Sequence, residues 1–286
     1  MHFVQAKSIL SSSNGINVYR GCTHGCIYCD SRSDCYGMAH EFTDIEVKEN
    51  APELLEAALR SKRKRCMIGT GAMCDPYLHA ERELQVTRRC LEIIHRYDFG
   101  AAVQTKSDLV MRDIDLLQQI NHSTKAVVQM TLTTVDDNMC SIIEPNVCNT
   151  SRRFEVLCEM KKADIPTVVW MCPILPFIND TEENILGIVD LAARAGCVGI
   201  ISFGIGMTLR DGDRQYYYNA LDRHFPGLRG EYIRRYGNSY EISSPNGGRL
   251  WSLFTSACEK AGLICDNNRL FGYLHEFPET EQLSLW

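Results

Sequence analysis

Three cysteines near the start of the chain have a spacing that suits metal chemistry. Cys22, Cys26 and Cys29 follow the pattern C-x3-C-x2-C, with Gly21 before the first cysteine and Gly25 before the second. Glycine lets the backbone turn tightly enough to direct three sulfur atoms at one point. Thiolates grouped in this way bind a soft metal ion or an iron–sulfur cluster.

The number of ligands separates the possible metal sites. A closed structural zinc site needs a fourth ligand, and Cys35 is the nearest cysteine that could supply it. A [4Fe–4S] cluster held by three cysteines would instead leave one iron open to a substrate or cofactor. Three ordinary buried thiols are the remaining alternative.

The stretch 19–30 resembles the cluster motif of the radical S-adenosylmethionine (AdoMet) enzymes, in which an aromatic residue such as Tyr28 usually precedes the third cysteine. The resemblance implies a [4Fe–4S] cluster on Cys22, Cys26 and Cys29, with AdoMet chelating the open iron. It also implies reductive cleavage of AdoMet to a 5′-deoxyadenosyl radical, and an electron donor such as flavodoxin or ferredoxin. A non-catalytic metal-binding or electron-transfer module is the alternative from another class.

Strand-like and helix-like segments alternate up to about Gly206. Apolar runs predict strands at 16–19, 66–69, 101–105, 126–133, 167–172 and 198–203. Helical spacing predicts helices at 51–61, 81–97, 112–120, 151–163 and 181–195. Asp180 or Thr181 is expected to cap the last helix. Strands that are apolar on both faces favour a parallel sheet covered by helices.

Six such units predict an α/β fold, a partial (β/α)6 TIM-like barrel with a C-terminal helical extension. The resemblance implies the same barrel. We expect 1–206 to form the barrel with its cluster loop, and 207–286 to pack on it, with a further helix at 247–262. Ligands of such sheets lie at the carboxyl ends of the strands.

Several short phrases resemble one branch of the family, the spore photoproduct lyase-like proteins. They are Asp75-Pro76-Tyr77 with Glu81, Thr105-Lys106-Ser107 with Arg112-Asp113, Glu144-Pro145, and Cys172-Pro173-Ile174-Leu175-Pro176 with Asn179-Asp180. Their order and spacing cover roughly 18–203. The resemblance implies a lyase-like radical reaction and favours a nucleic-acid lesion or a nucleotide as substrate. A peptide or a small metabolite is the alternative.

Glycines follow the second predicted strand in the run Gly69-Thr70-Gly71. Glycine at a strand end lets a ligand approach the backbone closely. Radical AdoMet enzymes hold here a motif of glycines and an acidic residue that binds the amino group of AdoMet. The resemblance therefore implies AdoMet contacts at Gly69, Thr70 and Gly71, made by backbone carbonyls because the acidic residue is absent. A plain loop is the alternative.

Polar side chains accompany the next two predicted strands. Lys106 can neutralise a carboxylate and Ser107 can hydrogen-bond one, and in the lyase-like proteins this position contributes to AdoMet binding. Gln129 and Thr131 are two residues apart, so they share one face of their strand. They could reach the ribose hydroxyls of AdoMet, or satisfy each other inside the barrel.

The loop after the second strand contains two candidates for the radical chemistry itself, Cys74 and Tyr77. The lyase family uses a cysteine in this loop to return a hydrogen atom to the product radical, and alignment on Asp75-Pro76 puts Ala72 at its position. Cys74 lies in the same loop, and Tyr77 is a second candidate relay through its phenol. A small residue filling a turn is the alternative for Cys74.

The composition limits partners and compartment. The 286 residues carry a net charge of -6, which disfavours strong non-specific binding to nucleic acid. Fourteen cysteines without a second C-x-x-C pair, no visible signal peptide and no bilayer-length apolar run predict a soluble cytoplasmic protein with no membrane contact. The basic run 60–65 is typical of a solvated helix end. A nucleic-acid contact is the alternative for that run and for the tyrosines at 216–218.

Overall fold

The computed structural model describes residues 1–71 and 73–278, and a six-stranded sheet forms its centre. In spatial order the strands are β2 (Gly15–Ile16), β5 (Met67–Thr70), β6 (Gly100–Thr105), β7 (Ala126–Thr131), β8 (Thr167–Trp170) and β9 (Gly199–Ile201). All neighbouring pairs are parallel, and β2 and β9 are the two edges. The prediction of a parallel, partial-barrel α/β fold is confirmed.

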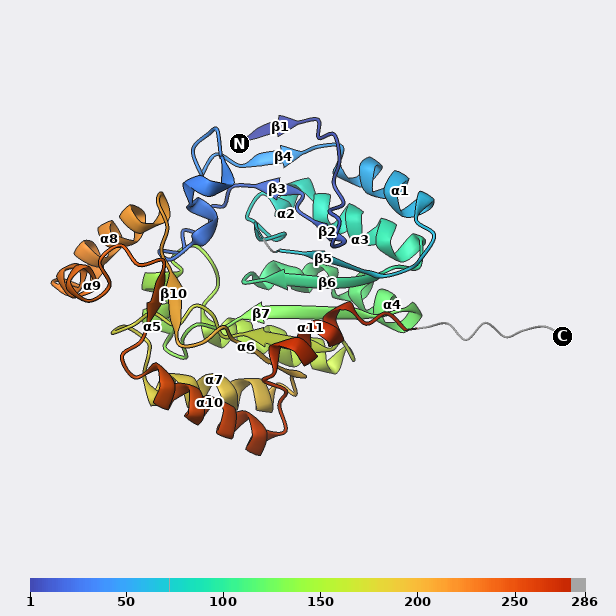
Figure 1. Ribbon diagram of the computed structural model, residues 1–286. Coiled ribbons are helices and arrows are strands. Elements are labelled where there is room, and N and C mark those ends of the chain that lie inside the picture. Colours follow the sequence, from blue (N-terminus) through green and yellow to red (C-terminus); the bar gives the residue numbers. More distant parts are fainter. Residues whose placement is uncertain (72, 279–286) are drawn as a thin grey trace.

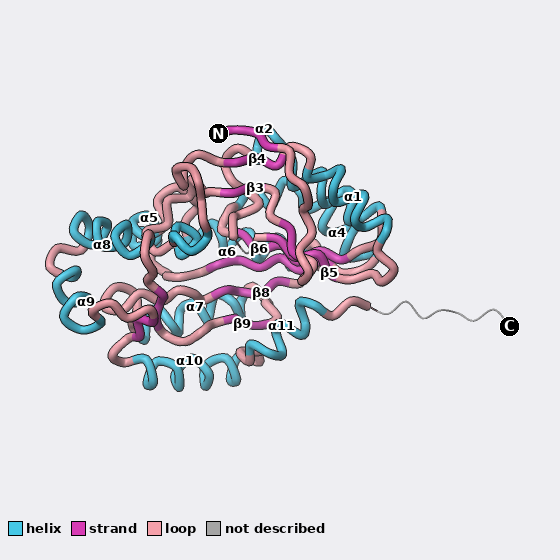
Figure 2. The backbone as a smooth tube through the Cα atoms, turned by 45° about the horizontal axis from the view of Figure 1, so that its top comes forward, coloured by secondary structure: helices cyan, strands magenta, loops and turns pink. Residues whose placement is uncertain are grey.

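Helices connect the strands and cover the sheet, as Figures 1 and 2 show. They are α1 (Ala51–Ser61), α2 (Glu81–Leu84), α3 (Val86–Arg96), α4 (Ile114–Ser123), α5 (Asp137–Ile143), α6 (Thr150–Lys162) and α7 (Glu182–Arg194). Short 3-10 helices span Asp30–Arg32, Asp34–Tyr36 and Asp108–Asp113. The hydroxyl of Thr181 accepts a hydrogen bond from Asn184 N at 3.2 Å and so caps α7, as one of the two predictions had it.

Two elements differ from the sequence prediction. The expected strand 16–19 is split, because β3 (Tyr19–Arg20) leaves the main sheet and pairs with β4 (Glu46–Lys48). The expected helix 81–97 is interrupted at Gln85, whose φ is 52°. The break lets the Glu81 carboxylate accept the N–H of Thr87 at 3.0 Å, which satisfies a free donor in the first turn of α3.

A small three-stranded sheet frames the segment that carries the three cysteines. Strand β1 (His2–Val4) runs parallel to β4, and β3 runs antiparallel to it. The cluster loop, residues 21–45, leaves from β3 and returns to β4. Both of its ends are therefore fixed by one sheet, and Figure 1 shows the loop beside the ends of the main strands.

The chain after β9 packs on the barrel. It forms β10 (Gly206–Thr208), α8 (Asp213–His224), α9 (Leu228–Tyr236) and β11 (Glu241–Ser243), which pairs antiparallel with β10, and then α10 (Gly247–Ala261) and α11 (Asn267–His275). Helix α10 lies against α7, and α11 lies against β9. The division at residue 206 remains a prediction. In the described ranges, no helix combines the length and the apolar character needed to cross a bilayer.

A nucleic-acid contact is the alternative for two features, the tyrosines at 216–218 and the basic run 60–65, which is expected to form a solvated helix end. Tyr217 and Tyr218 are buried and pack with Tyr232 in the core of the C-terminal helices. The basic run 60–65 ends α1 and leads into the first residue of β5. It therefore lies near the amino end of the strands, opposite the cysteines.

Candidate active site

The fold brings the three cysteines to the carboxyl end of the sheet. Cys22, Cys26 and Cys29 line one small cavity of about 130 Å³, together with Gly71 and Lys106 from the ends of β5 and β6. Burial raises the pKa of the Cys22 thiol to about 12 and also raises the pKa values of Cys26 and Cys29. The thiols are therefore protonated at neutral pH, and a metal that binds them must displace the protons.

Lys106 supplies the positive charge of this cavity. Burial alone would lower the pKa of its ammonium, but the neighbouring Cys26, Glu144 and Asp75 raise it, so the side chain stays charged. Its Nζ lies 6.0 Å from the centre of the Tyr28 ring. Among the described residues, none accepts a hydrogen bond from Nζ. The group is thus available to an anionic ligand.

Asp75 ties the loop after β5 to the end of β6. Its carboxylate accepts hydrogen bonds from Thr105 Oγ1 at 2.7 Å, Lys106 N at 2.8 Å and Tyr77 N at 2.9 Å. The same carboxylate lies 3.6 Å from Nδ1 of His24 in the cluster loop. The Asp-Pro-Tyr phrase therefore positions the backbone of Lys106 relative to the cysteines.

A buried ion pair supports the cluster loop from the other side. Glu144 and Arg153 have no exposed side-chain surface, and Arg153 Nη1 lies 2.5 Å from Glu144 Oε2. Burial disfavours the charged carboxylate, but Arg153 and Lys106 outweigh it and lower the pKa of Glu144. Glu144 also accepts the hydroxyl of Tyr28, the aromatic residue before the third cysteine. The backbone of Ile27 is held by Ile143 O at 3.0 Å.

Replacing Glu144 with alanine should lower the free energy of unfolding by about 3–5 kcal/mol, because it leaves the Arg153 charge buried and uncompensated. Urea denaturation of the metal-free chain measures this. Glu159, which forms an exposed pair with Lys162 at 2.5 Å, is the matched control. Its alanine variant should lose less than about 1 kcal/mol. Equal losses in the two variants would show that the buried pair does not support the loop.

A larger cavity of about 540 Å³ opens from the cysteine cavity. Six residues belong to both cavities: Cys29, Ser31, Met73, Gln104, Lys106 and Thr131. The cluster loop adds Tyr28 and Tyr36 to the larger cavity, and the ends of β8 and β9 add Trp170, Cys172 and Phe203. Tyr240, just before β11, also lines it. This cavity is wide enough for an organic ligand beside the cysteines, and its walls are rich in aromatic rings.

Gly71 borders the cysteine cavity, but the backbone itself requires this glycine. Its φ is 97°, and a Cβ atom would come within 2.1 Å of the carbonyl oxygen of Gln104. Any side chain would therefore disturb the β5–β6 edge, apart from any effect on a ligand. Ala72, the next residue, lies outside the described part of the chain.

Four other residues that were expected to contact AdoMet do not line the two cavities. Gly69 lies in the sheet beside Gly15, and Thr70 faces a small internal space beside α3. The hydroxyl of Ser107 caps the helical turn after β6 by accepting from Leu109 N at 3.2 Å. The amide oxygen of Gln129 accepts the indole N–H of Trp170 at 2.9 Å. Thr131, by contrast, lines both cavities, and its contact with AdoMet remains a prediction.

The two catalytic candidates, Cys74 and Tyr77, lie in different places. Tyr77 is 1% exposed, and its hydroxyl donates to Asp113 Oδ2 at 3.0 Å. Cys74 lies in the cysteine cavity, where its Sγ is 2.8 Å from the carbonyl oxygen of Gly21. The structure thus brings Cys74 near the other cysteines and directs Tyr77 away from them. Cys172, which the sequence prediction did not assign a role, lines the larger cavity.

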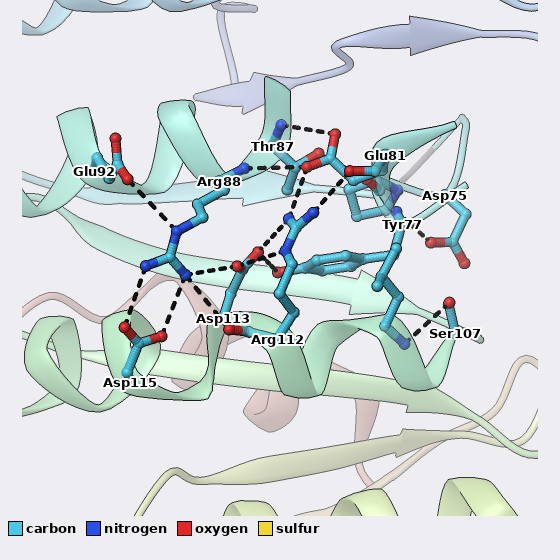
Figure 3. A network of polar contacts seen from close by, with 12 residues as sticks. Asp75, Tyr77, Glu81, Thr87, Arg88, Glu92, Ser107, Arg112, Asp113 and Asp115 are labelled. Carbon is cyan, nitrogen blue, oxygen red and sulfur yellow. Dashed lines mark hydrogen bonds and ion pairs between the residues drawn. The ribbon is translucent and has the colours of Figure 1, made fainter. Parts of the chain in front are cut away.

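Figure 3 shows why Tyr77 points away. Its phenol lies in a buried network in which Arg112 contacts Glu81 at 2.8 Å and Asp113 at 2.7 Å. Arg88 adds a contact to Asp113, also at 2.8 Å. The phrases around Glu81 and Arg112-Asp113 therefore hold the loop after β5 in place.

Sequence comparison identifies the family. The model of the radical SAM superfamily matches residues 16–192, which is more than half of the chain. The chain therefore belongs to the radical SAM superfamily. An uncharacterized protein of Mycobacterium tuberculosis is 25% identical over 77% of this chain and 66% of its own length. One from Methanocaldococcus jannaschii is 30% identical over 58% of this chain and 62% of its own length. The chain thus spans less than two thirds of these relatives.

Solved structures agree on the fold. Spore photoproduct lyase complexed with a dinucleoside spore photoproduct has a TM-score of 0.67 at 13% identity, over 90% of this chain and 78% of that one. A mutant of that lyase contains AdoMet. The radical AdoMet methyltransferase TsrM of Kitasatospora setae, with cobalamin and a [4Fe–4S] cluster, has a TM-score of 0.53 at 12% identity, over 94% and 54% of the two chains.

Proposed function

We propose that this chain is a radical AdoMet enzyme whose Cys22, Cys26 and Cys29 hold a [4Fe–4S] cluster. The observation that supports this most is the single cavity in which the three thiols and the Lys106 ammonium meet at the strand ends. Three thiolates suit such a cluster and leave an iron for AdoMet. When both are bound, the cluster would supply an electron, and AdoMet would supply the radical that abstracts a hydrogen atom.

The residues of the chain bind and orient these groups. Lys106 pairs with the carboxylate of AdoMet, and Thr131 and Gln104 offer hydrogen bonds at the junction of the two cavities. The Tyr28–Glu144 hydrogen bond fixes the loop between the second and third cysteines. Cys74 remains a candidate hydrogen donor, although its position beside Gly21 suits a packing role equally well.

The larger cavity takes the substrate, and we favour a lyase-like reaction on a nucleic-acid lesion or a nucleotide. The aromatic walls support this choice, because a flat base can stack on rings such as Phe203, Trp170 and Tyr240. Phe203 is 65% exposed, so one face of its ring is available. A peptide or a small metabolite with a planar ring is the second candidate for the same walls.

Replacing Phe203 with alanine should weaken binding of a single-stranded thymidine oligonucleotide about five- to hundredfold, since stacking contributes roughly 1–3 kcal/mol per base. Fluorescence anisotropy at several salt concentrations measures affinity, which should fall with added salt. Phe177, an exposed ring beside Tyr232 and Tyr236, is the matched control.

Neutralising Arg63, Lys64 and Arg65 together should leave the salt dependence unchanged, because this run lies at the opposite end of the strands. A flattened salt slope in that variant would put the nucleic acid on the wrong face for the proposal. If oligonucleotide affinity changes neither with added salt nor with the Phe203 substitution, a peptide or a small metabolite becomes the better substrate candidate.

Anaerobic reconstitution separates this function from a non-catalytic metal module. The proposal predicts a brown protein with about four irons per chain, and a colourless zinc protein would contradict it. An electron donor such as flavodoxin or ferredoxin completes the reaction.

Fourteen free cysteines, none of them in a disulfide, support a reducing cytoplasmic compartment.

A further inference from the structure

A second group of metal-binding side chains lies at the outer edge of the three-stranded sheet. His2, His40 and Asp44 each offer one ligand atom, and these three atoms lie within 4.8 Å of one another. Glu46 is a fourth neighbour, because its Oε2 lies 3.8 Å from His40 Nε2 and 4.0 Å from His2 Nε2. Two imidazoles with carboxylates form a donor set that suits zinc and similar divalent ions.

The fold itself assembles this group. The parallel register of β1 and β4 places His2 directly opposite Glu46. His40 and Asp44 come from the returning end of the cluster loop, which leads into β4. Residues that are far apart in sequence are thus brought together by backbone pairing rather than by chance contacts of long side chains.

The ring of His40 is oriented as in a metal ligand. Its Nδ1 lies 3.1 Å from the carbonyl oxygen of Glu41, so Nδ1–H donates there and Nε2 keeps its lone pair. That Nε2 atom is inaccessible to solvent and has no hydrogen-bond partner among the described residues. A backbone carbonyl that fixes one nitrogen while the other faces carboxylates is typical of metal-bound histidine. A bound cation would satisfy the buried atom.

His2 shows the matching arrangement with a carboxylate. Its Nδ1 lies 2.9 Å from Asp44 Oδ2, which leaves Nε2 directed toward Glu46. The other oxygen of Asp44 contacts the amino group of Met1 at 2.6 Å. Asp44 can therefore orient His2 while Nε2 binds the ion, as carboxylates do in carboxylate–histidine–zinc triads.

We propose that His2, His40 and Glu46 bind a divalent transition-metal ion such as Zn²⁺, with Asp44 positioning His2. Ligands about 2.0–2.1 Å from a tetrahedral zinc ion lie about 3.4 Å apart. The observed gaps of 3.8 and 4.0 Å to Glu46 need to close by only about half an ångström. The ion would fasten β1 to the returning end of the cluster loop. The site does not depend on the proposed iron–sulfur cluster.

Zinc titration of the full chain with Cys22, Cys26 and Cys29 all changed to alanine tests the site, because the competing thiolates are then removed. Competition with a chromophoric chelator should give about one tight zinc site per chain. His40→Gln should lose that site. Asp44→Asn should weaken it about ten- to hundredfold, the usual effect of removing an orienting partner. His122→Gln, an exposed histidine on α4, is the matched control and should bind zinc normally.

Two further measurements keep the result decisive. Cobalt bound to the same variant should lack the strong sulfur-to-metal absorption band, since nitrogen and oxygen ligands give only weak bands. His2→Gln, checked for native circular dichroism, provides a second ligand variant if His40→Gln does not fold. Zinc should raise the melting temperature of the chain that lacks the three cysteines, but not that of the same chain with His40→Gln or His2→Gln added. Equal zinc affinity in all three chains, or a sulfur band with cobalt, would overturn the proposal.

Discussion

Changing Cys26 to alanine should remove most of the iron from the reconstituted protein. Cys26 is the most deeply buried of the three cluster cysteines, at 7% exposure, and lies between the other two in the loop. Two remaining thiolates cannot hold a cubane that normally has a thiolate on at least three irons. The same loss is expected for Cys22→Ala and Cys29→Ala. Iron and acid-labile sulfide analysis after anaerobic reconstitution measures the effect.

Cys35 provides the control for this experiment. It is exposed, and its sulfur lies 3.3 Å from Nη1 of Arg210 rather than in the cysteine cavity. Cys35→Ala should therefore retain its iron. If it lost the metal as completely as Cys26→Ala, a site with four cysteines, and so zinc, would be the better explanation.

Changing Lys106 to methionine should weaken AdoMet binding about ten- to hundredfold while the iron content stays normal. A hydrogen bond to a charged group contributes roughly 1.5–3 kcal/mol, and each 1.4 kcal/mol is about tenfold in affinity. Methionine keeps most of the side-chain volume, so the variant mainly removes charge. Isothermal titration of the reconstituted protein with AdoMet measures the affinity.

Lys125 is the matched control, because it is also largely buried but donates a hydrogen bond to the backbone carbonyl of Tyr273 in α11. Lys125→Met should bind AdoMet normally. Normal affinity in Lys106→Met would place the AdoMet carboxylate elsewhere. A loss of iron in that variant would mean that the ammonium chiefly stabilises the cysteine loop.

The inner strands of the main sheet were predictable because they are short apolar runs that are largely buried on both faces. In β7, for example, Val127, Val128 and Met130 have no exposed surface. The division of 16–19 between two sheets was not predictable, because it depends on pairing with β4, a partner about thirty residues further along the chain. The break at Gln85 likewise depends on a carboxylate that caps the next helix.

The candidate site was predictable at the cysteines and at the strand ends, but less so in its details. Alternation along β7 puts Gln129 and Thr131 on one face. The side-chain oxygen of Gln129, however, accepts a hydrogen bond from the indole of Trp170. The support from Glu144 and Arg153 joins residues to a loop more than a hundred positions earlier. Such long-range ion pairs leave no periodic signal in a single sequence.

The most direct test of the central claim is formation of 5′-deoxyadenosine from AdoMet by the reconstituted, chemically reduced protein. The proposal predicts that the wild-type chain and Cys35→Ala form it, and that Cys26→Ala does not. Chromatography with mass detection under strict anaerobiosis provides the measurement. A wild-type protein that carries the full cluster, binds AdoMet and still forms no 5′-deoxyadenosine, with or without oligonucleotide, would contradict the proposed radical function.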